Sequence, residues 1–143
     1  MTANELRIGN LVDLGNRIAK VIEINHLACV VVDLEETQDT IEDYDRIKPI
    51  QLTRELLLKF GFVEKNIANK LSESWYELKY LSNEHDKIIT SWVSILLNIE
   101  TWSCVICDEH PEEIGANTKA KIEYVHQLRN LCFALIGAEL TFE

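Results

Sequence analysis

The chain of 143 residues carries 24 acidic and 14 basic side chains, which gives it a formal net charge of −10. Its length fits one domain or one compact unit of two small lobes, and its apolar content of 47% is too high for a disordered chain. The acidic excess argues against binding to nucleic acid or to an acidic partner. The excess of acidic residues would then serve either to bind a basic partner or only to keep the protein soluble.

Cysteine usage and the start of the chain bear on the cellular compartment. The four cysteines are Cys29, Cys104, Cys107 and Cys132, and the first residues lack the basic stretch and apolar core of a secretion signal. No apolar run is long enough to span a bilayer. We therefore expect a soluble, cytoplasmic protein with free thiols and no membrane contact.

Short β-branched runs separated by turn residues dominate residues 1–50. The runs cover residues 17–24 and 28–34, and Gly15-Asn16 and Asn25-His26 interrupt them. Residues 34–43 form a polar, acidic connection, and Ile41 with Tyr44 starts the next short strand. Pro49 cannot donate a ladder hydrogen bond and should lie at an edge. This rhythm predicts a small β-barrel of the SH3-like kind.

A short helix and a β-meander are expected next. Thr53 is a good N-cap and Gly61 a good C-terminal residue, so we predict a helix over residues 53–60. Alternating and aromatic segments then predict antiparallel strands over residues 75–81, 87–92, 94–99 and 102–107. One long strand over residues 88–97 is an open alternative to the two middle strands. A polar loop should cover residues 108–119.

The last segment has the clearest helical periodicity. Val125, Leu128, Cys132 and Leu135 fall on one face, and Gly137 caps the end, so a packed helix over residues 122–135 is expected. The predicted fold class is therefore α+β, with an SH3-like barrel lobe over residues 1–50. A second lobe of helix, meander and final helix covers residues 51–143, and the two form one compact unit.

Two motifs resemble known sites. The spacing of Cys104 and Cys107 matches a redox or zinc pair, but residues three apart in a strand point to opposite faces, so we interpret both as buried thiols and expect no metal. Residues 108–113 hold five ionisable groups without the pattern of a calcium loop, and we expect a solvated turn.

A second acidic run flanks the predicted barrel, where it would steer a basic ligand if it is more than a solvated surface. Its members are Asp33, Glu35, Glu36, Asp39, Glu42, Asp43 and Asp45. No phosphate loop, nucleophile elbow or zinc-protease helix occurs in the sequence. The sequence therefore names no catalytic residue, no cofactor-binding residue and no cofactor.

The final helix carries a second face away from its apolar stripe. His126, Asn130, Phe133 and Gly137 lie on it, and an aromatic side chain is unexpected on a solvated surface. The simpler interpretation is a helix buried on two sides, between the meander and the barrel. The functional interpretation is a surface for a protein partner or for self-association.

Both ends of the chain resemble a family of uncharacterised small proteins from Bacteroidetes and their phages or mobile elements. The similar segments are LRIGNLV at residues 6–12, IKPIQLT at 47–53, LLLKFGF at 56–62 and YVHQLRNLCFALIGAEL at 124–140. The resemblance implies a bacterial or phage cytoplasmic protein. The family has no established activity, so it implies no functional residue.

Three functions remain open from the sequence. The first is a non-enzymatic binding or adaptor module that acts through protein contacts, which we favour. The second is a nucleic-acid-associated barrel of a phage or mobile element, which requires Arg7, Arg17, Lys20, Arg46 and Lys48 on one face. The third is a small enzyme whose site would assemble from distant residues.

Overall fold

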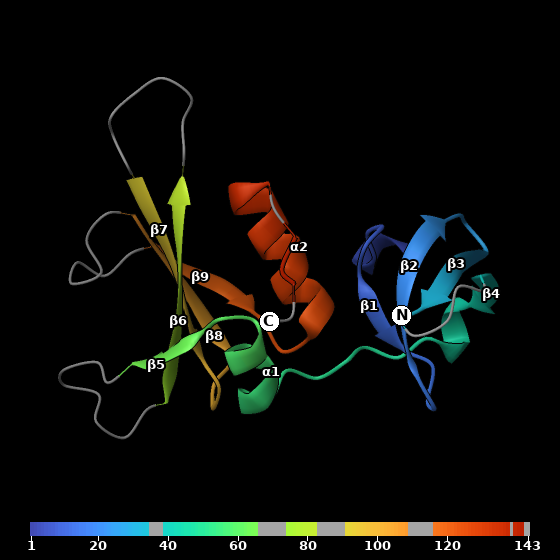
Figure 1. Cartoon of the computed structure of the whole chain (residues 1–143), viewed down its shortest axis with the longest axis horizontal. Coiled ribbons are helices and arrows are strands. Elements are labelled where there is room, and N and C mark those ends of the chain that lie inside the picture. The colour runs from blue at the N-terminus through green and yellow to red at the C-terminus, as the bar shows by residue number, and fades with distance from the viewer. Residues whose placement is uncertain (35–38, 66–73, 83–90, 109–115, 138, 142–143) are drawn as a thin grey trace. The chain divides into compact units, whose positions relative to one another are not determined.

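The computed structural model describes residues 1–34, 39–65, 74–82, 91–108, 116–137 and 139–141 (Figure 1). The chain forms two compact units. Unit 1 consists of Met1–Leu52 with Glu123–Leu140, and unit 2 of Thr53–Ile122 with Thr141–Glu143. The final helix is thus grouped with the N-terminal strands, whereas the sequence-based division assigned it to the second lobe.

Unit 1 is built on a four-stranded antiparallel sheet in the order β1-β2-β3-β4. The strands are β1 (Leu11–Asp13), β2 (Ile18–Ile24), β3 (Ala28–Asp33) and β4 (Asp39–Asp43), flanked by the 3-10 turns η1 (Ala3–Glu5) and η2 (Tyr44–Arg46). One face of the sheet forms the core of this unit, because every second side chain of a strand points the same way. The core residues are Leu6, Val12, Ala19, Val21, Cys29, Val31 and Ile47.

The predicted SH3-like barrel is wrong. Across the described residues β1 and β4 are the two edges of an open sheet, and β1 gains only an isolated bridge between Asp13 and Lys48. With a second antiparallel sheet in unit 2, the fold is β-rich, so the α+β architecture of a barrel followed by a helix-packed meander is overturned. Alternation and turn residues specify hairpins between neighbouring strands, whereas closure depends on tilt and stagger summed over all strands.

The helix α2 (Val125–Ile136) completes unit 1, which confirms the predicted C-terminal helix with a start three residues later. Residues 50–52 pair with the segment at the start of α2. The Ile50 carbonyl accepts a hydrogen bond from the Val125 amide at 2.9 Å, and Gln51 forms a β-bridge with Tyr124. Gly137 ends the helix in the left-handed conformation, with φ of 68°.

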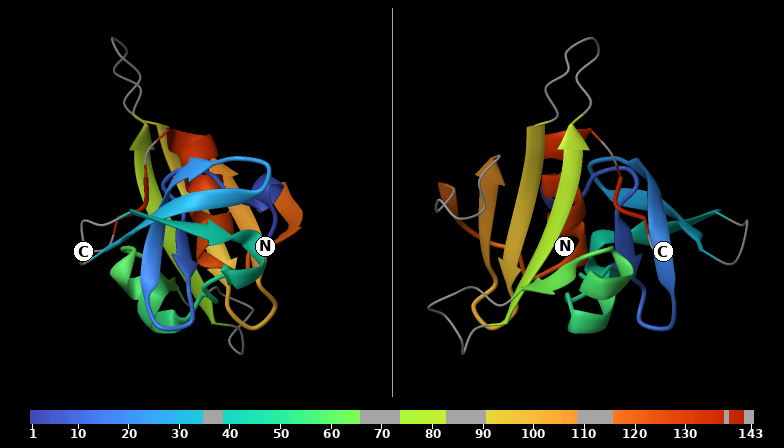
Figure 2. Two further views of the ribbon diagram at one scale, coloured as in Figure 1. Left: turned by 90° about the vertical axis from the view of Figure 1, so that its right-hand side faces the viewer. Right: turned by 60° about the vertical axis from the view of Figure 1, so that its left-hand side comes forward.

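Unit 2 contains the predicted short helix and a five-stranded antiparallel meander (Figure 2). The Thr53 side chain accepts from the Leu56 amide at the start of α1 (Arg54–Lys59), as a capping residue should. The strands, in sheet order, are β5 (Val63–Lys65), β6 (Trp75–Ser82), β7 (Ser91–Asn98), β8 (Ser103–Asp108) and β9 (Ala116–Lys121).

Three details of the meander differ from the prediction. β7 runs unbroken through Trp92 and Val93, as in the single-strand alternative, although residues 87–90 lie outside the described part. β9 occupies part of the predicted polar loop, and β5 was not predicted. β9 holds only small and polar residues and β5 is exposed throughout, so neither carries a row of large apolar side chains. Pairing with β8 and β6 makes them strands.

Neither helix in the described part of the chain has the length and apolar character needed to cross a membrane.

Candidate functional site

The second face of α2 is largely occupied within unit 1. His126 is 4% exposed and stacks on Tyr124, with ring centroids 5.9 Å apart. Burial lowers the pKa of His126, and its Nδ1 atom has no hydrogen-bond partner in the described residues. Asn130 Oδ1 accepts from Asn10 Nδ2 at 2.8 Å and from Arg7 Nε at 3.2 Å. These two side chains therefore serve the packing of unit 1.

Phe133 and Gly137 are the exposed members of that face. The Arg7 guanidinium lies over the Phe133 ring, 4.1 Å from its centroid, and Phe133 remains 40% exposed. Gly137 serves as the helix cap. Three of the four predicted residues thus lie on α2 and Gly137 directly follows it, and Phe133 and Gly137 are the members of this face that remain exposed.

A buried arginine holds the end of α2 to the start of the chain. Arg129 donates to the carbonyl oxygens of Leu140 and Gly9 and to the Glu139 carboxylate, the last at 2.9 Å. Arg7 donates to the same carboxylate at 2.5 Å, and its hydrogen bond is the largest cause of the lowered pKa of Glu139. We call this the arginine clamp. It joins α2 and the residues that follow it to the distant start of the chain and has a structural role.

The face of the N-terminal sheet opposite its core is partly exposed and partly apolar; Leu11 and Ala28, which the register places on it, are buried. We call it the outer face, and it carries Ile18, Lys20, Val30, Val32, Asp39, Ile41 and Asp43. The assignment follows from the register. Val31 of β3 and its partner Val21 of β2 are fully buried, whereas Val30 and Val32, the neighbours of Val31 along β3, are only partly buried. Strand alternation therefore places a row of β-branched side chains on the exposed side.

Strand β4 is the most exposed part of the outer face. Ile41 is 76% exposed, and Asp39 and Asp43, two residues away on either side, are exposed too. β4 pairs with β3 on one side, and no backbone partner occurs on its other side among the described residues. An unpaired edge with a large exposed aliphatic side chain is a surface suited to binding another chain.

The charge at this edge is acidic and uncompensated. In the described chain no ion pair involves Asp39, Glu42 or Asp43 of β4. The base on the outer face, Lys20, lies two strands away on β2. Arg17 forms an ion pair with Asp33 at 2.9 Å. The edge therefore presents a negative field to a partner.

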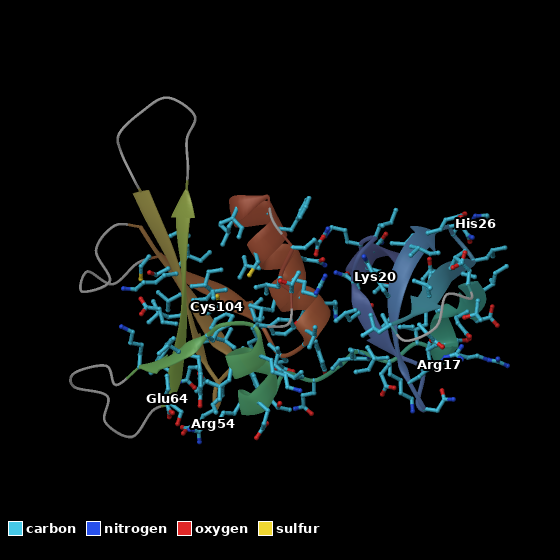
Figure 3. The ribbon with its side chains drawn as sticks, in the orientation of Figure 1. Arg17, Lys20, His26, Arg54, Glu64 and Cys104 are labelled. Carbon is cyan, nitrogen blue, oxygen red and sulfur yellow. The ribbon has the colours of Figure 1, made fainter. Side chains whose placement is uncertain are left out.

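Two of the five bases required by a nucleic-acid barrel are engaged in ion pairs. Arg7 belongs to the arginine clamp and Arg17 is ion-paired, while Lys20, Arg46 and Lys48 are exposed. Figure 3 shows His26 at the β2–β3 turn, apart from Arg17 and Lys20.

A groove of about 510 Å³ borders the other end of the N-terminal sheet. It is wide and open, and polar and apolar side chains line it in similar measure. The lining residues are Asp13, Asn16, Arg17, Ile18, Pro49, Ile50 and Gln51. Small-molecule sites bury most of their ligand, so this shallow groove is not suited to one.

The four cysteines are buried and none of them forms a disulfide, as expected. Cys107 packs with Trp75 and Leu96. Within the described ranges, no group of three metal-ligating side chains exists. The acidic turn at residues 109–113 and the pair Glu35 and Glu36 lie outside the described residues.

Charged side chains in unit 2 pair with one another. Arg54 of α1 binds Glu64 of β5 at 2.8 Å, and Figure 3 shows the two side by side. The buried carboxylate of Glu77 lies 2.9 Å from Lys65 Nζ and 3.8 Å from Lys79 Nζ. These pairs offset the charges of the five side chains involved.

The β4 edge was missed from the sequence, although a signal was present. The sequence predicts an acidic connection over residues 34–43, with the next short strand starting at Ile41. The alternation Asp39-x-Ile41-x-Asp43 instead marks a strand with one apolar side chain between two acids on one face.

Comparisons with known proteins add no relative. No family model matches the chain, and the searches of curated proteins and of solved structures found no match. The resemblance to small Bacteroidetes and phage proteins therefore stays a prediction.

Proposed function

We propose that the chain is a non-enzymatic binding or adaptor protein that acts in the cytoplasm through protein–protein contacts. The observation that carries the proposal is Ile41, an aliphatic side chain 76% exposed on a strand edge that has no partner in the described residues. Burying an exposed isoleucine side chain contributes about 1.5–3 kcal/mol, so a protein that covers this edge would gain binding free energy from Ile41.

A different protein suits this edge better than a second copy. An antiparallel pair of β4 strands centred on Ile41 would place Asp39 of one copy opposite Asp43 of the other, twice. Like charges directly opposite one another destabilise a strand pair, and natural sheets use such charges to prevent self-pairing. The acids at either side of Ile41 therefore select against self-association and for a basic partner.

The test compares three proteins as immobilised bait in lysate of the native host, with captured proteins quantified by mass spectrometry. Ile41→Lys adds a charge at the centre of the edge, and Leu58→Lys makes the same kind of change at a side chain 48% exposed on α1. We expect a specific partner to be retained by the wild type and by Leu58→Lys and to be lost at least tenfold with Ile41→Lys. Circular dichroism checks that both variants are folded.

Equal capture by Ile41→Lys and by the wild type would contradict the proposal, because it would place the contact elsewhere. Binding of labelled single-stranded DNA or RNA by the wild type at low salt would favour the nucleic-acid alternative instead.

A further inference from the structure

We infer that the partner of the β4 edge is an extended segment with the pattern basic–x–apolar–x–basic, which adds to the sheet as a fifth strand. The inference rests on the proposed function and specifies its partner. The geometry of β4 alone defines the pattern, through which side chains share its outer face and which charges they carry.

The register of the sheet gives the spacing. Asp39, Ile41 and Asp43 pair with Val32, Val30 and Ala28 of β3, so the three β4 side chains stand in a row on the outer face. A strand added to the free edge would place its own alternate side chains directly opposite these three, with Cβ atoms about 4.5–5.5 Å apart in an antiparallel pair. The middle position faces Ile41, and the outer two face the acids.

The same register makes the pattern independent of strand direction. The row in β4 reads acid, apolar, acid from either end. An antiparallel and a parallel partner therefore both meet a basic, an apolar and a basic position. The proposal thus commits to spacing and charge and needs no choice of orientation.

Charge selects the outer two positions. Asp39 and Asp43 have no basic neighbour on β4 or on the paired residues of β3, and Lys20 is two strands away. Opposite charges across a strand pair contribute about 0.2–1 kcal/mol each, which corresponds to a factor of about 1.4–5 in affinity per pair. Two such pairs give up to about 25-fold over a neutral segment.

The backbone contributes the rest of the affinity. An edge strand presents amide and carbonyl groups that point away from its partner strand and are open to another chain. Strand addition uses these groups for affinity and alternate side chains for specificity. The five residues of β4 match a partner segment of similar length.

The experiment titrates three nine-residue peptides into the full chain labelled with ¹⁵N and follows the amide signals by NMR. The first peptide, Gly-Thr-Lys-Thr-Ile-Thr-Lys-Thr-Gly, has the inferred spacing. The second, Gly-Thr-Thr-Lys-Ile-Lys-Thr-Thr-Gly, has the same composition and charge but puts both lysines on the opposite face from isoleucine. The third replaces both lysines of the first with glutamate.

We expect the first peptide to bind with shifts centred on residues 39–43, and the second and third to bind at least fivefold more weakly. In the variant Asp39→Lys/Asp43→Lys the preference should reverse, so that the glutamate peptide binds better than the first. This reversal separates a register-specific contact from general attraction to an acidic protein.

Equal binding of the first and second peptides, or shifts outside β4 and β3, would overturn the inference, as would no binding of the first peptide at 1 mM. If the peptides fail while capture from lysate still depends on Ile41, the proposed function stands and only the partner class is wrong. If capture does not depend on Ile41 either, both fail.

Discussion

Removal of Arg129 tests whether the arginine clamp holds unit 1 together. The side chain is 7% exposed and satisfies the buried carbonyl oxygens of Gly9 and Leu140 as well as Glu139. In Arg129→Met both carbonyls lose a donor, at about 1–3 kcal/mol each. The ion pair adds little, because Glu139 is partly exposed and keeps Arg7 as a partner. The variant also no longer has to bury a charged guanidinium, and the desolvation cost that this saves offsets part of the loss of stability.

The expected net loss is about 3 kcal/mol of unfolding free energy, or roughly 10 °C in Tm. The assay is urea unfolding followed by far-ultraviolet circular dichroism. Arg54→Met is the matched control, because it makes the same change in the exposed ion pair with Glu64 and should cost under about 1 kcal/mol. Equal losses in the two variants, or a loss below about 1 kcal/mol for Arg129→Met, would refute the structural role of the clamp.

Three further predictions concern other parts of the chain. Folding lowers the pKa of buried His126, so near pH 6.5 the unfolded chain binds a proton that the folded chain does not. The contribution of His126 to stability is therefore full above that pH and falls as the pH drops toward the lowered pKa. In a series of Tm measurements from pH 7.5 to 5, the fall in Tm should be smaller for His126→Gln than for the wild type. Gly137→Ala places a Cβ in open space at φ of 68°, so thermal unfolding should show a loss of about 1 kcal/mol from backbone strain alone, and an unchanged Tm would disprove the left-handed cap. The four thiols should resist Ellman's reagent in the native protein and all react in urea, and rapid native reaction of any one would contradict their burial.

Local features were predictable where neighbouring residues decide them. Thr53 caps the start of α1 and Gly137 caps the end of α2, as the capping rules predict. The runs at residues 17–24 and 28–34 form β2 and β3. The candidate site was less accessible from the sequence. The face of α2 was recognised as unusual, but only the structure shows that Asn130 is bound by Arg7 and Asn10, more than a hundred residues away.

By itself, the sequence determined the turns, the helix ends and most of the strand segments, because capping, φ preferences and apolar alternation act over a few neighbouring residues. Only the tertiary structure decided that the N-terminal strands remain an open sheet in the described residues and that α2 belongs to their unit. It also decided that Ile41 lies on an unpaired edge between two acids. Such outcomes depend on which distant segments meet, and pairing between distant segments leaves no local pattern in the chain.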